Sequence, residues 1–506
     1  MASAPPREPE TPKADLQALA KGGRTNLFGF VLRLAARIPF LFIAGRWYGA
    51  EALGIFAYAV IVVEFVAQLA TLGLKRGLAE RLSNTDRPHV HEIWDAMLAG
   101  FAASAIGVML LIAFPWAMFP NSEIQGIERL LPLTIFALVA SDIALAALAY
   151  RHDIASTVRA RAIIEPWTIS IAAFALAFVS SRDGLIIAYV LSMIAALLAS
   201  LWPLIRTYGL PYGWRPHPGR VIQLAWYNLP LAAADAIEWI SRRIDIAILG
   251  LFFGPVIVGI YYVAQQVASL PQKLKTSFDP ILGPVITKNL KEGNKAAVAH
   301  QVKQAGFWII AAQAGVALAL GIPGEAVMGL VGAAFVGGTG VLAFLLAAEV
   351  VAATAAVSES ALIYVARHRN LMISTFMIVV QAALSVALIL LFQHLEWSEL
   401  YQATGPAIAL MLALGMASIM KARLLSRLLA APVSPWRWAL VWATGAATVV
   451  GFIATQVPEW MELAIGVPAV LAVYCAIIWL RGFGEEDRML FRSAKKAEGV
   501  SLPEGR

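Results

Sequence analysis

The chain has 506 residues, of which 60% are hydrophobic and only 14% are charged, and its mean hydropathy is +0.73. In soluble globular proteins about a quarter of the residues are charged, so the composition excludes that class and indicates a polytopic membrane protein. Cys475 is the single cysteine, which excludes an intrachain disulfide, and no cysteine or histidine spacing predicts a metal or cofactor site. The net charge of +7 is explained by basic residues in the connections between apolar segments, so it does not predict a nucleic-acid partner.

Apolar segments of about 20 residues follow one another along most of the chain, and each is long enough to cross a hydrocarbon core of about 30 Å. They predict an all-α membrane protein with about fourteen transmembrane helices. The predicted spans are 25–45, 50–72, 93–115, 129–150, 160–180, 184–205, 220–252, 256–284, 304–325, 339–362, 371–393, 402–422, 437–456 and 462–480. Residues 1–24 and 482–506 are expected to be cytoplasmic tails.

Basic residues divide unequally between the two sets of connections. If the N-terminus is cytoplasmic, the side opposite to it receives only Arg46, Arg129 and Arg182. The cytoplasmic connections contain Lys75, Arg76, Arg81, Arg87, Arg151, Arg159, Arg161, Arg206, Arg215, Arg220, Lys288, Lys291, Lys295, Lys303, Arg367, Arg369, Lys421, Arg423, Arg427 and Arg437. Cytoplasmic loops of membrane proteins carry an excess of Lys and Arg, so both termini are predicted to be cytoplasmic.

An internal repeat divides the predicted helices. The segment 48–56, between the first two helices, reappears as 253–261 between the seventh and eighth, with the shared pattern aromatic-Gly-x4-Gly-Ile-aromatic and an offset of 205 residues. Six helices separate the copies, so the halves share one orientation as parallel repeats. We expect two six-helix bundles, 25–205 and 206–425, a cavity between them, and two further helices within 426–481.

The seventh predicted helix carries five charges inside an otherwise apolar run. On one continuous helix, the spacing of three, four and three residues places four of them on one stripe, beside Arg243. The five charged residues are Asp235, Glu238, Arg242, Arg243 and Asp245. A charge at the bilayer centre costs roughly 2.5–3.5 kcal/mol, so this stripe is expected to line a polar cavity or to pair with a neighbouring helix.

Other predicted helices also place polar groups at membrane depth. These are Arg33 and Arg37 in helix 1, Glu64 in helix 2, Asp142 in helix 4, Gln265 in helix 8 and Glu349 in helix 10. Such groups mark substrate or ion pathways by default. The alternative is structural pairing, of Arg33 and Arg37 with Glu64, or of the helix 7 arginines with Asp235 and Asp245. For Asp142, Glu64 and Glu349 the choice between an ion-coupling site and a structural bridge stays open.

Taken together, these features resemble the Wzx-type polysaccharide flippases of the multidrug/oligosaccharidyl-lipid/polysaccharide (MOP) exporter superfamily. The resemblance rests on twelve core helices in two halves, the glycine joints at 49–56 and 254–261, the Arg-x-Asp ending of helix 7 and the run at 327–335. It implies a V-shaped transporter fold in the inner membrane of a bacterium. It also implies export of a polyprenyl-pyrophosphate-linked oligosaccharide for O-antigen, capsule or exopolysaccharide, by alternating access coupled to a cation gradient.

The chemistry of such a substrate agrees with the residues. Arginines offer forked donors to a pyrophosphate, and the candidates are Arg33, Arg37, Arg242 and Arg243. Aromatic rings can stack on sugars, and the candidates are Trp226, Tyr227, Trp239, Tyr261 and Tyr262, although the first two suit membrane anchoring equally well. A polysaccharide polymerase and chain-length proteins are the expected partners.

Three other functions were weighed. An enzyme is disfavoured because no predicted connection exceeds about 20 residues, too short for an ordered catalytic loop. A peptidoglycan-precursor flippase and a cation-coupled drug antiporter of the same superfamily remain alternatives. The paired arginines favour an anionic lipid over cationic drugs.

Overall fold

The computed structural model describes residues 38–122, 126–180, 182–276, 292–484 and the single positions 286, 289–290 and 487–488. All regular secondary structure within these ranges is helical. Ten helical segments of the described chain are long and apolar enough to cross a membrane, which confirms the predicted all-α membrane fold. The count of fourteen stays a prediction, because most of the first span, 25–45, lies outside the described residues, and the predicted spans 220–252, 256–284 and 437–456 are not among the ten.

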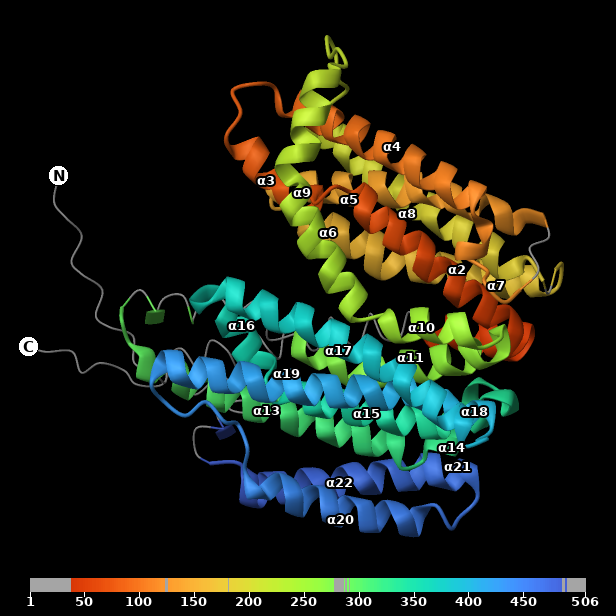
Figure 1. Ribbon diagram of the computed structural model, residues 1–506, viewed down its shortest axis with the longest axis vertical. Coiled ribbons are helices and arrows are strands. Elements are labelled where there is room, and N and C mark those ends of the chain that lie inside the picture. Colours follow the sequence, from red (N-terminus) through yellow and green to blue (C-terminus); the bar gives the residue numbers. More distant parts are fainter. Residues whose placement is uncertain are drawn as a thin grey trace, which may run out of the picture.

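The helices form two lobes and an appended pair, and the lobes lie one above the other in Figure 1. The first lobe consists of η1 (Ala44–Tyr48), α2 (Gly49–Ala70), α3 (Leu74–Ser83), α4 (His89–Ala113), η2 (Pro115–Ala117), η3 (Gly126–Leu133), α5 (Thr134–Tyr150), α6 (Ile154–Thr157), η4 (Val158–Ile164), α7 (Glu165–Ala177), α8 (Gly184–Tyr208) and α9 (Pro218–Ser241). These elements correspond to predicted helices 2–6 and the first part of helix 7.

The second lobe begins after α9. It consists of α10 (Ile244–Phe252), α11 (Pro255–Thr276), α13 (Lys295–Gly321), α14 (Gly324–Val331), η5 (Ala333–Gly338), α15 (Thr339–Ala353), α16 (Ala356–Val365), α17 (Arg367–His394), α18 (Glu399–Gln402) and α19 (Thr404–Leu429). The appended pair, α20 (Trp438–Ala454) and α22 (Val467–Ile477), packs against α13, and α22 is flanked by α21 (Glu459–Met461), η6 (Glu462–Gly466) and η7 (Ile478–Gly482).

Three predicted helices differ from the structure. The predicted helix 7, 220–252, is broken between Ser241 and Ile244, so α9 and α10 belong to different lobes. The predicted helix 10, 339–362, is broken between α15 and α16 at Thr354 and Ala355. The predicted helix 9, 304–325, begins at Lys295, because residues expected in a cytoplasmic connection continue the helical turns of α13.

The two lobes repeat the same set of helix contacts. In the first lobe α2 packs on α4, α4 on α5, α5 on α8, and α7 on α8. In the second lobe the equivalent pairs are α11 on α13, α13 on α15, α15 on α19, and α17 on α19. Because each pair has a counterpart in the same chain order, the two halves repeat one helix arrangement, as the sequence pattern predicted.

The lobes meet where α2 crosses α11, at the two glycines of the repeat. A Cβ added to Gly54 would lie 1.8 Å from the carbonyl oxygen of Pro255, and one added to Gly259 would lie 2.0 Å from that of Ala50. Both distances are far below van der Waals contact, so the two backbones touch. Since Pro255 and Gly259 are each 205 residues after Ala50 and Gly54, the contact is symmetric between the repeats.

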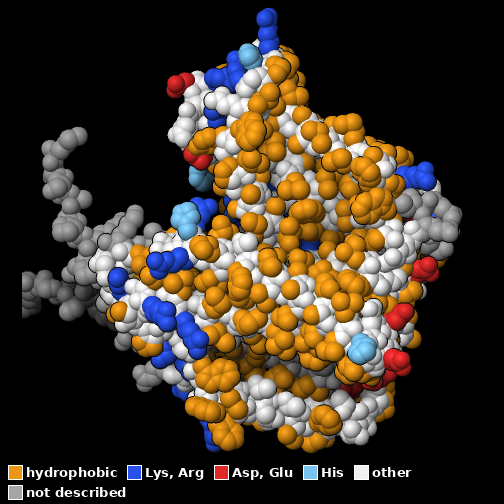
Figure 2. Space-filling model, viewed as in Figure 1, with side chains coloured by type: hydrophobic (Ala, Val, Ile, Leu, Met, Phe, Trp, Pro, Cys, Tyr) orange, Lys and Arg blue, Asp and Glu red, His pale blue; other side chains and the backbone are white. Residues whose placement is uncertain are grey.

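The outer surface of the lobes is apolar, as a membrane requires. Large side chains such as Trp202, Ile171 and Phe452 are 65–72% exposed, and Figure 2 shows hydrophobic side chains over most of the visible face. In the same view Lys and Arg gather mostly on the side of α3 and α16, and Asp and Glu of the second lobe on the opposite side. The predicted cytoplasmic side is therefore the more basic one.

A buried ion pair closes the appended pair onto the second lobe. The carboxylate of Asp487, which is 2% exposed, lies 2.6 Å from Nη1 of Arg437. It also accepts hydrogen bonds from the indole of Trp308, at 2.6 Å, and from the amide of Gln304. Arg437 caps Phe307 with its guanidinium 3.8 Å from the ring centre. These contacts join α13, the start of α20 and the segment after η7.

The glycine contact gives the first prediction. Gly259→Leu is expected to lower the free energy of unfolding by at least about 3 kcal/mol, because backbone atoms cannot move aside for the new side chain. A thermal unfolding curve of the detergent-solubilised protein measures this. Gly254→Leu is the matched control, since no atom lies within 4 Å of a Cβ built at that position. Equal melting temperatures for the two variants would show that the α2–α11 contact does not hold the lobes.

Candidate translocation site

The break in the predicted helix 7 is the joint between the lobes. α9 packs mainly on α2, α3 and α4 of the first lobe and α10 mainly on α11, α17 and α19 of the second, while smaller contacts of α9 with α17 and of α10 with α2 cross between the lobes. Arg242 and Arg243 form the joint itself, with the backbone N–H groups of both residues bonded to the last turn of α9. The charged stripe predicted for one helix is therefore divided, and its members meet different surroundings.

Arg243 pairs across the joint with the first lobe. Its Nη1 donates a short hydrogen bond to the carboxylate of Glu64 on α2, and its guanidinium lies 5.0 Å from the ring centre of Trp239. The side chains of Arg243 and Glu64 are 36% and 30% exposed, so the ion pair is only partly buried. Arg242 is exposed beside it. This pairing differs from the expected ones, in which Arg243 was matched with Asp235 or Asp245.

Asp235 is held by the first lobe. Its side chain is 4% exposed, and its Oδ1 lies 3.2 Å from Nε of Arg76 on α3. The sequence assigned Arg76 only to a cytoplasmic connection, but it neutralises a carboxylate of α9. The side chain of Glu238, one turn further along α9, lies outside the described residues, as do Arg33 and Arg37.

Asp245 is enclosed in the second lobe, at the first turn of α10. Its carboxylate is 1% exposed and accepts hydrogen bonds from the hydroxyl of Tyr261 at 2.8 Å and the amide of Gln265 at 3.0 and 3.2 Å. Tyr261 is fully buried, so its ring cannot stack on a sugar in this conformation. In this conformation Asp245 and Tyr261 therefore belong to a closed polar cluster within the lobe, and their contact with a substrate stays a prediction.

Asp142 lies in a network of four charges inside the first lobe. Its Oδ2 is 2.8 Å from Nζ of Lys75 and its Oδ1 accepts a short hydrogen bond from Arg161. Arg161 also donates to Glu165 at 2.8 Å, and Lys75 donates to Gln68 at 2.7 Å. Two cations and two carboxylates balance one another, so the structure favours a bridging role for Asp142. Glu349, the counterpart in the second lobe, lies half-buried on α15.

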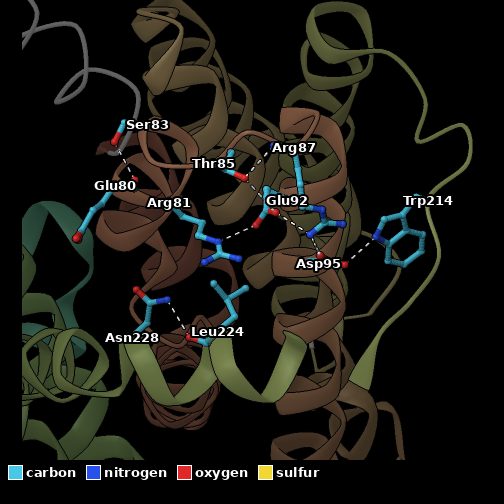
Figure 3. A network of polar contacts seen from close by, with 10 residues as sticks. All are labelled: Glu80, Arg81, Ser83, Thr85, Arg87, Glu92, Asp95, Trp214, Leu224 and Asn228. Carbon is cyan, nitrogen blue, oxygen red and sulfur yellow. Dashed lines mark hydrogen bonds and ion pairs between the residues drawn. The ribbon is translucent and has the colours of Figure 1, made fainter. Parts of the chain in front are cut away.

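A second network of arginines and carboxylates ties α3 to α4 (Figure 3). Arg81 donates to Glu92 at 2.8 Å, and Arg87 contacts both Glu92 at 2.7 Å and Asp95 at 3.0 Å. The indole of Trp214 donates to the other oxygen of Asp95 at 2.8 Å. Both carboxylates are almost fully buried. Burial lowers the pKa of Arg87, but its hydrogen bonds and the charges of the two carboxylates outweigh this and raise that pKa overall.

Sequence reasoning missed these counter-ions for one reason. The sequence assigned Lys75, Arg76, Arg81, Arg87 and Arg161 only to predicted cytoplasmic connections. Their side chains nevertheless reach back to acidic groups of the first lobe. The four-residue spacing of Arg161 and Glu165 on one helical face was the only local signal.

Comparisons with known proteins agree with this architecture. Residues 44–317 match the family described as "Polysaccharide biosynthesis protein", and this match covers more than half of the chain. The chain belongs to this family. The comparison with curated proteins found no match.

Solved structures of low sequence identity share the fold. One is the lipid II flippase MurJ in an inward closed conformation, with a TM-score of 0.71, 12% identity and coverage of 90% of this chain and 99% of that one. Another is a multidrug resistance MATE family transporter of the MOP superfamily in an inward-facing conformation, with a TM-score of 0.62, 13% identity and coverage of 79% and 98%. A third is a MOP superfamily transporter from Pyrococcus furiosus, with a TM-score of 0.52, 14% identity and coverage of 83% of this chain and 96% of that one. The predicted MOP fold is confirmed.

The Arg243–Glu64 pair gives the second prediction. Glu64→Gln and Arg243→Gln should each lower the melting temperature, because each leaves a half-buried charge without its partner. The double variant should recover part of the loss, with an interaction energy on the order of 1 kcal/mol, since both side chains are about a third exposed. The same cycle with the exposed Arg206→Gln in place of Arg243→Gln is the control and should be additive. Additive losses for Glu64 and Arg243 would contradict the pairing.

Proposed function

We propose that this protein is a flippase that moves a polyprenyl-pyrophosphate-linked oligosaccharide from the inner to the outer leaflet of a bacterial cytoplasmic membrane, and that it is not an enzyme. The observation that carries the proposal is the arginine joint between two lobes in a member of a polysaccharide biosynthesis family. Its product would feed assembly of a surface polysaccharide such as O-antigen, capsule or exopolysaccharide. A polysaccharide polymerase and chain-length proteins would act next.

The joint suits a lipid pyrophosphate for physical reasons. A pyrophosphate and a glycan cannot cross the hydrocarbon core of a membrane unaided, whereas the polyprenyl tail is soluble in it. Arg242 is exposed at the joint, and a guanidinium offers a planar pair of donors that matches a phosphate. Arg37 occupies the equivalent place in the first repeat, 205 residues earlier, and lies outside the described residues. The two would then contact one pyrophosphate from opposite sides.

Alternating access follows from how the lobes are joined. α9 belongs to one lobe and α10 to the other, so a change in the angle between the lobes must be absorbed at Arg242 and Arg243. A ligand bound at the joint contacts both lobes and can favour one angle over another through its differential affinity. Both termini would lie in the cytoplasm, on the basic side of the molecule.

The third prediction tests the substrate. Arg242→Ala should lower the rate of flipping of a short-chain lipid-pyrophosphate oligosaccharide in liposomes by at least about tenfold, because charge-assisted hydrogen bonds to the pyrophosphate are lost. Arg242→Lys should lose less, since it keeps the charge without the fork. Arg37→Ala should resemble Arg242→Ala, and Arg206→Ala, an exposed residue in the last turn of α8, is the control.

The outcomes separate the candidate functions. Wild-type flipping by a well-inserted Arg37→Ala, Arg242→Ala double variant would refute the pyrophosphate contact. Preference for a peptidoglycan precursor over other lipid-linked glycans would assign the protein to the first alternative. Export of a cationic dye by the wild type, with no flipping of any lipid-linked sugar, would assign it to the drug antiporters.

We further propose that Asp245 couples transport to a cation gradient. Asp142 and Glu64 have cationic partners, whereas Asp245 is held by a hydroxyl and an amide, with no cation in ion-pair distance among the described side chains. A buried carboxylate with only neutral donors gains most from binding a proton or a metal cation. Arg243, which pairs with Glu64 of the first lobe, precedes Asp245 by two residues, so binding at Asp245 would act on the angle between the lobes.

The fourth prediction follows from this contrast. Asp245→Asn should insert normally yet flip substrate at a rate that no longer responds to an imposed proton or sodium gradient, because the amide binds neither ion. Asp142→Asn should instead lower the amount of folded protein, since Lys75 and Arg161 lose their partner. Transport in proteoliposomes with and without the gradient, beside membrane abundance, measures both. A gradient response unchanged in Asp245→Asn would return the coupling role to Glu349.

A further inference from the structure

A small pocket opens between α3 and α9, away from the joint. Its volume is about 200 Å³, the space of a single sugar ring rather than of a chain. The lining side chains are Glu80, Arg81, Asn84, Gln223, Leu224 and Tyr227. Three come from α3 or its C-cap and three from the first turns of α9, on the side of the molecule where basic residues gather.

Contacts between α3 and α9, and a bond from Arg81 to Glu92, hold the walls of this pocket in place. A Cβ on Gly77 would lie 1.9 Å from Oδ1 of Asn228, so α3 and α9 are in direct contact below the pocket. The amide of Asn228 in turn donates to the carbonyl of Leu224 at 2.9 Å. On the other wall, the Nε of Arg81 is bound to the buried Glu92. Figure 3 shows these groups together, with Leu224 and Asn228 on α9 facing α3. The pocket is therefore preformed.

The lining is rich in groups that recognise sugars. The ring of Tyr227 is 63% exposed and its hydroxyl donates to Glu80 at 2.8 Å, which fixes the ring at the pocket. The side chains of Asn84 and Gln223 are exposed at the pocket, so their amides are accessible to a ligand. An aromatic face beside planar amide, carboxylate and guanidinium groups offers stacking together with donors and acceptors for hydroxyl groups.

The charges in the pocket favour binding of a neutral sugar over binding of a phosphate. Glu80 and Arg81 contribute one negative and one positive charge, and the guanidinium of Arg81 is already engaged by Glu92. A pyrophosphate would meet the carboxylate of Glu80 without an uncommitted cation to offset the repulsion. A neutral, hydroxyl-bearing ligand meets no such penalty.

We propose that this pocket binds one sugar unit of the glycan portion of the substrate, at a distance from the arginines that would hold its pyrophosphate. The inference rests on the proposed function for the identity of the glycan. On the predicted topology the pocket lies at the cytoplasmic face of the first lobe, where the glycan is presented before transport. Recognition there selects for the sugar, whereas the joint selects for the pyrophosphate.

The fifth prediction tests the pocket by direct binding. Full-length protein in nanodiscs is titrated with the methyl glycosides of a neutral hexose, an N-acetylhexosamine and a hexuronic acid, and saturation-transfer NMR reports binding. At least one neutral glycoside should bind to the wild type. Tyr227→Ala and Gln223→Ala should weaken that binding roughly fivefold to tenfold, because stacking or an amide hydrogen bond is lost. Tyr212→Ala, an 80% exposed tyrosine outside the pocket, should leave it unchanged.

Several results would overturn the proposal. Failure of all three glycosides to bind to the wild type would do so, as would equal binding by Tyr227→Ala. Displacement of the glycoside by inorganic pyrophosphate would show an anion site instead. Flipping by the wild type in liposomes, measured in parallel, separates this test from the proposed function. If the wild type flips the lipid-linked oligosaccharide but Tyr227→Ala binds the glycoside as well as the wild type does, only the proposed sugar pocket is refuted. If the wild type flips no lipid-linked oligosaccharide but its glycoside binding depends on Tyr227, only the proposed transport substrate is refuted.

Discussion

The contact of α2 with α11 is the constraint on which the rest of this structure depends. Gly54 and Gly259 allow two backbones to touch at the centre of the molecule, and each lobe is built outward from one of these helices. In a membrane, lipid removes the hydrophobic drive between helices, so close packing of small residues is a main source of association. Smaller contacts join the lobes beside it, such as the hydrogen bond from the hydroxyl of Tyr58 on α2 to the carbonyl of Ala247 on α10 at 3.3 Å.

Charge within the first lobe is managed by local neutralisation. Asp142, Asp235 and Glu92 each receive an arginine or lysine from a segment near the basic side, which lowers the cost of keeping a carboxylate in a medium of low dielectric. Asp245 is treated differently, with neutral donors alone. The contrast divides groups that stabilise the lobe from a group whose charge can respond to a ligand.

Much of the fold could be predicted from the sequence, and the candidate site only in part. Runs of about 20 apolar residues and the repeated glycine pattern are strong, local signals, and they predicted the helices and the two halves. The break at Arg242 and Arg243 has no proline or glycine to announce it, because it arises from α9 and α10 packing on different lobes. Ion-pair partners were also beyond reach, since Arg243 and Glu64 are 179 residues apart and only the tertiary fold brings them together.

The ion pair of Asp487 with Arg437 has a consequence for the order of events during synthesis. Arg437 precedes α20, and its partner follows 50 residues later, after both helices of the appended pair. Until the ribosome has made Asp487, the guanidinium can rest on Phe307 and Gln304 but lacks its carboxylate. Domains made first generally fold first. The two lobes can thus assemble while the appended pair of helices is still loosely attached, and the pairing of Asp487 with Arg437 then fixes that pair to the second lobe.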